Sequence, residues 1–121
     1  MRTATASTGP RQSPIEMDND IVKAVEFLVH SANDIGRAKE RAVKAEKMLG
    51  HVEALMTIAS DEKTAAAREA SAKASERYVE AINEHAAAAG ELAKLYSLRD
   101  AASMKVEAWR TWCATNRSYR G

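Results

Sequence analysis

The sequence predicts an all-α protein: a long antiparallel helical hairpin of the coiled-coil type, with a short connecting helix or helical loop, that assembles into oligomers. The main observation is a seven-residue repeat sustained over six heptads. Its two tracks hold Ile21, Leu28, Ile35, Ala42, Leu49 and Met56, and Ala24, Ser31, Ala38, Ala45, Val52 and Ala59. Such a repeat is typical of one long helix packed along its length on another. A second apolar stripe with helical spacing follows an alanine-rich connector. The sequence contains no run of alternating β-branched residues long enough for a strand.

Composition and charge narrow the class of protein. A chain of 121 residues is one domain, and aromatic residues are only 5% of it, which favours long helices over a thick globular core. The net charge of +1 supplies no global field for nucleic acid or a membrane surface, so such binding needs local charge. The chain has one cysteine, Cys113, no apolar run of ~20 residues and no signal-peptide core. We therefore expect a cytoplasmic protein without a membrane partner.

The chain divides into a hairpin domain and two tails. Residues 1–18 hold Ser, Thr, Gly and two prolines with almost nothing to bury, so we expect a flexible N-terminal tail. Residues 19–115 are expected to form the helical hairpin domain, and residues 116–121 a frayed C-terminal tail.

The first helix should start after an N-cap at Asp18 or Asn19 and run from residue 20 to residue 59. Gly36 and Gly50 interrupt it, at a cost of about 1 kcal/mol each relative to alanine. These glycines are either tolerated weak points or places where a partner backbone approaches closely, and the sequence leaves both interpretations open.

The second long helix should run from Ser75 to Ala114, after a break at residues 60–63 and a short helix or helical loop at residues 64–74. Its apolar stripe holds Tyr78, Ala81, Ile82, His85, Ala88, Ala89, Leu92, Leu95, Tyr96, Ala102, Val106, Trp109 and Cys113. The residues expected to pack between the helices are Ile21, Leu28, Ile35, Leu49, Val52, Met56, Tyr78, Ile82, Leu92, Leu95 and Val106. The antiparallel pairing we predict sets Ile21 against Cys113 and Met56 against Tyr78.

Self-association is expected because this hairpin has little to bury. Its seam is rich in alanine, which contributes little apolar area. Larger apolar side chains fall partly off the seam and need another surface: Val22, Val43, Leu55, Ile58 and Leu98. A lone hairpin would be marginally stable, so we expect a homo-oligomer.

No catalytic or cofactor chemistry is predicted. His30, His51 and His85 share no metal-ligand spacing with one another or with Cys113, and His85 is interpreted as a packed seam histidine. Each glycine stands alone, so no phosphate-binding loop is present. We expect no catalytic residue, no metal site and no cofactor.

Two basic segments are the candidates for nucleic-acid binding. The first holds Arg37, Lys39, Arg41, Lys44 and Lys47, and the second holds Lys94, Arg99, Lys105, Arg110, Arg117 and Arg120, interleaved with Trp109 and Trp112. Arginines for phosphates and aromatic faces for unstacked bases are typical of single-stranded DNA binding. The competing interpretation is structural. Trp109 then closes the end of the hairpin, and Asp18, Asp20 and Glu26 neutralise the arginines.

Part of the sequence resembles small helical proteins encoded in phage recombination and replication gene modules. The matching pieces are AVEFL (24–28), RAKER (37–41), SERY (75–78) and above all KVEAWRTWCATNR (105–117). Residues 42–47 depart from that group, whose members often carry bulky aromatic and leucine residues there. By its helix–connector–helix layout, the group is in turn similar to the UvsY-type phage recombination mediators.

The resemblance implies a non-catalytic recombination accessory protein in a bacterial host's cytoplasm. Such a protein oligomerises, binds single-stranded DNA and works with a recombinase or a single-strand-binding protein. Lys105, Arg110 and Arg117 would then contact phosphates, and Trp109 or Trp112 would stack on bases. The alternatives are a helical adaptor or inhibitor that binds only protein, and a small structural protein of the virion.

Overall fold

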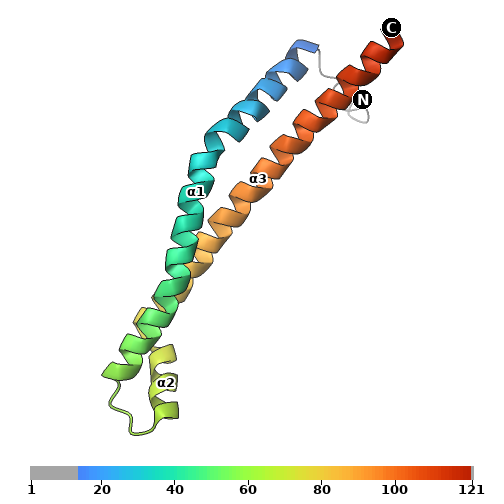
Figure 1. Cartoon of the computed structure of the whole chain (residues 1–121). Coiled ribbons are helices and arrows are strands. Elements are labelled where there is room, and N and C mark those ends of the chain that lie inside the picture. Colours follow the sequence, from blue (N-terminus) through green and yellow to red (C-terminus); the bar gives the residue numbers. More distant parts are fainter. Residues whose placement is uncertain (1–13, 121) are drawn as a thin grey trace, which may run out of the picture. The chain divides into compact units, whose positions relative to one another are not determined.

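The described part of the chain is entirely helical apart from its connections. The computed structural model describes the backbone of residues 14–120 and the side chains of residues 18–117. Within these limits the elements are α1 (Pro14–Ala59), α2 (Ala65–Ala74) and α3 (Glu76–Arg120) (Figure 1). The predicted class, an all-α hairpin of two long helices with a short connecting helix, is confirmed.

Helix α1 begins earlier than predicted. Its first residue is Pro14, six positions before the expected start, so neither Asp18 nor Asn19 is its N-cap. Proline suits the first position of a helix because the N–H that it lacks has no acceptor there. Helix α3 likewise continues to Arg120, through the residues that were expected to fray. Residues 1–13 of the predicted tail lie outside the described residues.

Side-chain caps define the connection between the long helices. Thr64 is the N-cap of α2, and its Oγ1 accepts a hydrogen bond from the backbone N–H of Ala67 at 3.1 Å. Ser75 separates α2 from α3: its backbone is extended, its Oγ donates to the Ala72 carbonyl at 2.6 Å, and the same Oγ accepts from the Tyr78 N–H at 3.2 Å. One serine therefore ends one helix and starts the next, near the predicted position.

The fold divides into two compact units, which are described separately. The terminal unit consists of Met1–Ser31 and Leu98–Gly121, and the connector unit consists of Ala32–Ser97. In each unit a stretch of α1 lies beside a stretch of α3 that runs in the opposite direction (Figure 1). The connector unit also contains α2.

The predicted seven-residue repeat is the buried face of α1. All of its buried side chains among the described residues lie on the two tracks: Ala24, Ser31, Ile35, Ala38, Ala45 and Val52. On α3 the buried residues are Ala88 and Ala102. Among these eight residues only Ile35 and Val52 are larger than serine, so the helices approach closely but bury little apolar area.

Most of the other predicted seam residues are half-buried, and one is not. Ile21, Leu28, Leu49, Met56, Tyr78, Leu92, Leu95 and Val106 are of intermediate exposure. Ile82, by contrast, is 42% exposed. Its neighbour Ala81 lies one step around the helix and is half-buried, so the inclusion of Ile82 in the seam was wrong.

The predicted register between α1 and α3 was also wrong. Pairing Met56 with Tyr78 would set Arg41 opposite Ala93, but Arg41 forms an ion pair with Glu84, at 2.8 Å. Glu84 lies nine residues before Ala93, so the contact is displaced by more than one heptad toward the start of α3. The cause is α2, which packs against the end of α1: Ala72 is 1% exposed, and Lys73 Nζ lies 3.7 Å from a carboxylate oxygen of Glu53. The last turns of α1 are therefore not available to α3.

Candidate interaction surfaces

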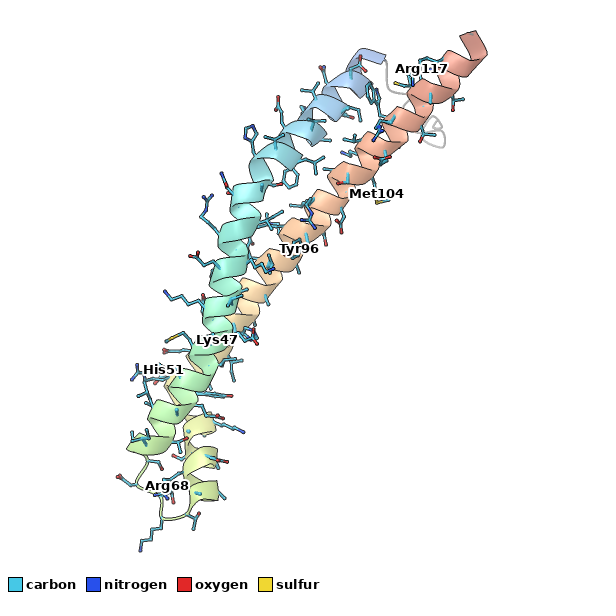
Figure 2. The ribbon with its side chains drawn as sticks, in the orientation of Figure 1. Lys47, His51, Arg68, Tyr96, Met104 and Arg117 are labelled. Carbon is cyan, nitrogen blue, oxygen red and sulfur yellow. The ribbon has the colours of Figure 1, made fainter. Side chains whose placement is uncertain are left out.

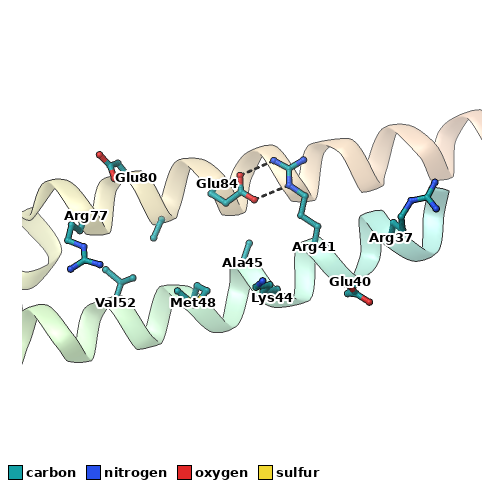
Figure 3. A pocket seen from close by; sticks show the side chains of 11 residues that line it. Arg37, Glu40, Arg41, Lys44, Ala45, Met48, Val52, Arg77, Glu80 and Glu84 are labelled. Carbon is teal, nitrogen blue, oxygen red and sulfur yellow. Dashed lines mark hydrogen bonds and ion pairs between the residues drawn. The ribbon is translucent and has the colours of Figure 1, made fainter. Parts of the chain in front are cut away.

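The first predicted basic segment lies along a charged groove in the connector unit. This ionic groove, of about 670 Å³, is lined by Arg37, Glu40, Arg41, Lys44, Ala45, Met48, Val52, Arg77, Glu80, Ala81 and Glu84 (Figure 3). Its four cations face three carboxylates, so the groove presents both signs of charge. Such a lining does not provide the excess of positive charge that a phosphate backbone needs.

A two-fold hydrogen-bonded ion pair crosses this groove. The Arg41 guanidinium donates from Nε and Nη2 to the two carboxylate oxygens of Glu84, at 2.9 and 2.8 Å (Figure 3). The hydrogen bond from Arg41 holds the pKa of the Glu84 carboxyl below its ordinary value, and the same bond raises the pKa of Arg41. Arg37 is also paired, with Asp34 one turn before it. Arg37 and Arg41, two of the five cations in the first basic segment, are therefore paired with carboxylates of the chain.

The other side of the connector unit is mainly apolar. Its groove, of about 360 Å³, is lined by Lys39, Ala42, Val43, Glu46, His85, Ala89, Leu92, Ala93 and Tyr96. His85 is half-buried here, as expected of a seam histidine, whereas His30 and His51 are exposed. Lys39, which we assigned to the basic segment, lies at the edge of this apolar groove, and Lys47 is exposed on α1 (Figure 2).

The second basic segment occupies the end of α3 in the terminal unit. A shallow hollow of about 520 Å³ is lined there by Glu107, Trp109, Arg110, Thr111, Cys113, Ala114 and Arg117. The two tryptophans differ in exposure: Trp109 is half-buried, and Trp112 is 47% exposed. Arg117 is also exposed (Figure 2).

The cations of this second segment are placed in different ways. Arg110 forms an ion pair with Glu107 of its own helix, at 3.1 Å, in which both side chains are about 70% exposed. Lys105 lines a separate groove with Asp20, Lys23 and Phe27. Arg99 is exposed on α3, and the side chain of Arg120 lies outside the described residues. The hollow at the end of α3 therefore brings together Trp109, Arg110 and Arg117, whereas the exposed Trp112 does not line it.

Exposed apolar side chains are a feature of the surface that the sequence pattern only partly predicts. The large ones are Val22, Val25, Val29, Val43, Met48, Leu55, Ile58, Val79, Ile82, Leu98, Met104 and Trp112, with Ile58 81% and Met104 72% exposed. Figure 2 labels Met104 on α3. The five that were singled out from the sequence are all among these exposed side chains. The remainder were missed because side-chain exposure on a two-helix hairpin depends on which flank the second helix covers.

The described residues contain neither a cluster of metal ligands nor a membrane-spanning helix. No group of three or more His, Cys, Asp or Glu side chains is placed there to hold a metal ion. None of the helices, over the same residues, combines the length with the apolar character that crossing a membrane requires.

Comparison of the chain with protein-family models, with curated proteins and with solved structures finds no match.

Proposed function

We propose that the protein is a non-catalytic accessory protein of DNA recombination that acts by assembly: it binds to itself through its helices and presents the end of α3 to single-stranded DNA. The observation that carries the assembly step is the contrast between its core and its surface. The core of the described residues is mostly alanine, whereas valine, leucine, isoleucine and methionine side chains are exposed. Burial of these side chains against another chain stabilises the hairpin by about 25 cal/mol per Å².

The DNA-binding step rests on the end of α3. Trp112 is exposed, and Arg110 and Arg117 line a hollow with the half-buried Trp109, so one short stretch of α3 carries two tryptophan rings and two guanidinium groups. Aromatic stacking is worth about 1–3 kcal/mol per base, and arginines neutralise phosphates without regard to sequence. The resemblance of residues 105–117 to phage recombination-module proteins supports the same assignment. A recombinase or a single-strand-binding protein is the partner that this function implies.

The competing function is that of a protein-binding adaptor without DNA contact. It is favoured by one observation: Arg37 and Arg41 of the first basic segment are both paired with carboxylates of the chain. In that case the exposed apolar side chains bind another protein and the net positive charge of α3 has no ligand.

A fluorescence anisotropy titration with a labelled single-stranded oligonucleotide separates the two functions. The native chain is expected to bind at low salt, and each lost phosphate contact should flatten the log–log salt dependence by about 0.7. A variant with Arg110, Arg117 and Arg120 changed to alanine should bind more weakly. The matched control changes Lys23, Lys63 and Lys73 to alanine, which removes the same charge elsewhere. Absence of binding by the native chain, or equal loss in both variants, supports the adaptor.

A further inference from the structure

We infer that one exposed face of α1 in the connector unit is the contact between two copies of this chain, packed antiparallel across a two-fold axis at Val43. This inference rests on the self-association in the proposed function and names its surface. The Val43 face, as we call it, is built from Gly36, Lys39, Glu40, Val43, Glu46, Lys47 and Gly50, all of which are exposed. Val43 itself is 47% exposed.

The charges of this face complement their own two-fold image. Lys39 and Glu46 lie on one flank of Val43, because both line the apolar groove. Glu40 lies on the other flank, where it lines the ionic groove. Lys47, seven residues after Glu40, follows it on that second flank at 3.6 residues per turn.

A two-fold axis perpendicular to the plane of two antiparallel helices keeps each flank on its own side. It sets Lys39 against the second copy's acidic position 46, and Glu40 against the second copy's basic position 47, each contact occurring twice. A parallel arrangement in register would set Lys39 against the second copy's acidic position 40 and Glu46 against its basic position 47. Charge complementarity therefore identifies a second copy as the occupant of this face, and the exchange of charges at positions 39 and 46 described below separates the antiparallel orientation from the parallel one.

Within the part of the chain that the structure describes, none of these four charged groups has a partner. Among the described residues, the ion pairs that involve α1 use Asp34, Arg37, Arg41 and Glu53. Lys39, Glu40, Glu46 and Lys47 form no hydrogen bond or ion pair of their own there. They are therefore free to pair between chains.

The two glycines of the face agree with the same axis. Gly36 and Gly50 lie seven residues before and after Val43, so the axis brings each against the other glycine of the second copy. A Cβ built on either of them meets nothing within 4 Å in the chain. The close approach of helices inside the hairpin therefore does not require them, whereas close approach of a second copy's backbone explains both.

The closing experiment combines a cross-link with a charge exchange, all in a Cys113→Ser background. Val43→Cys places a thiol at the axis, where it meets its own copy, and mild oxidation should give a covalent dimer as the main product. The control is Lys63→Cys, in the connection before α2, which this axis sets far from its own copy.

In light scattering, Lys39→Glu should weaken the dimer by about tenfold, because a repulsion replaces an attraction at two places.

The compensating double variant Lys39→Glu/Glu46→Lys restores opposite charges across the axis and should return the dimer to within about twofold of the native affinity. Lys63→Glu makes the same change in net charge away from the face and should leave association unchanged. If the native chain is monomeric at tens of micromolar, both the self-association and this inference fail. If it associates, but Val43→Cys cross-links no better than Lys63→Cys or the double variant stays as weak as Lys39→Glu, only the Val43 face is overturned.

Discussion

Arg41 and Glu84, 43 residues apart in the chain, are joined by two hydrogen bonds of 2.9 and 2.8 Å between a guanidinium group and a carboxylate. Both side chains are about half exposed, at 47% and 50%. Because the pair links α1 to α3, its geometry reports the register of the hairpin in the connector unit. It also pairs the central arginine of the first basic segment with a carboxylate of the chain.

The first prediction concerns the pH dependence of this pair. The pKa of Glu84 is lower in the folded chain than its ordinary value of about 4.5, so the pair stabilises the fold fully above that value. This stability is lost as the pH falls through the lowered pKa of the folded state. Glu84→Gln should therefore reduce the loss of helicity between pH 5 and 3, followed by circular dichroism at 222 nm. An unchanged acid profile would show that the pair contributes nothing to stability.

A second prediction concerns Ser31, which lies on the seam. Its side chain is 3% exposed, and its Oγ has no hydrogen-bond partner. A buried hydroxyl without a partner is unfavourable, so Ser31→Ala should increase the free energy of unfolding by about 1 kcal/mol. The matched control is Ser103→Ala. Because Ser103 is exposed on α3, this change should alter the free energy of unfolding only by the difference in helix propensity between serine and alanine. Urea unfolding at one fixed protein concentration measures both, and an equal gain at the two sites would contradict the prediction.

The alanines of the seam should not accept larger side chains. Ala88 is 0% exposed, so the extra atoms of Ala88→Leu would force α1 and α3 apart and destabilise the chain by about 1–3 kcal/mol. Ala87→Leu, at the exposed neighbouring position, should change the stability by less than about 0.5 kcal/mol. Thermal unfolding of the two variants decides the point; similar melting temperatures would mean that the helices pack loosely at Ala88.

Cys113 is expected to act as a small apolar side chain. It is a free, half-buried thiol near the end of α3. Cys113→Ser should leave the oligomeric state and any DNA affinity unchanged, with a loss of stability below about 1 kcal/mol. Light scattering and the anisotropy titration test this, and a change in either would give the thiol a role in the assembly or in the DNA surface.

The sequence by itself determined the helices and the face of α1 that packs. The two tracks from Ile21 and Ala24 include each buried residue of α1 whose side chain is described, because a heptad repeat specifies one stripe of a helix whatever lies opposite. The short α2 and the start of α3 near Ser75 were also predicted. Trp109, which belongs to the predicted apolar stripe of the second long helix, is half-buried, whereas Trp112, which does not, is 47% exposed.

Only the tertiary structure decided the register in which α1 and α3 pack. A seven-residue repeat is nearly unchanged by a shift of one heptad, so the register could not be read from the tracks, and the packing of α2 on the end of α1 displaced it. The Arg41–Glu84 pair follows from that register. Local spacing therefore determines which face of a helix is apolar. The residues that meet across two helices depend on contacts between positions far apart in the chain, for which spacing carries no information.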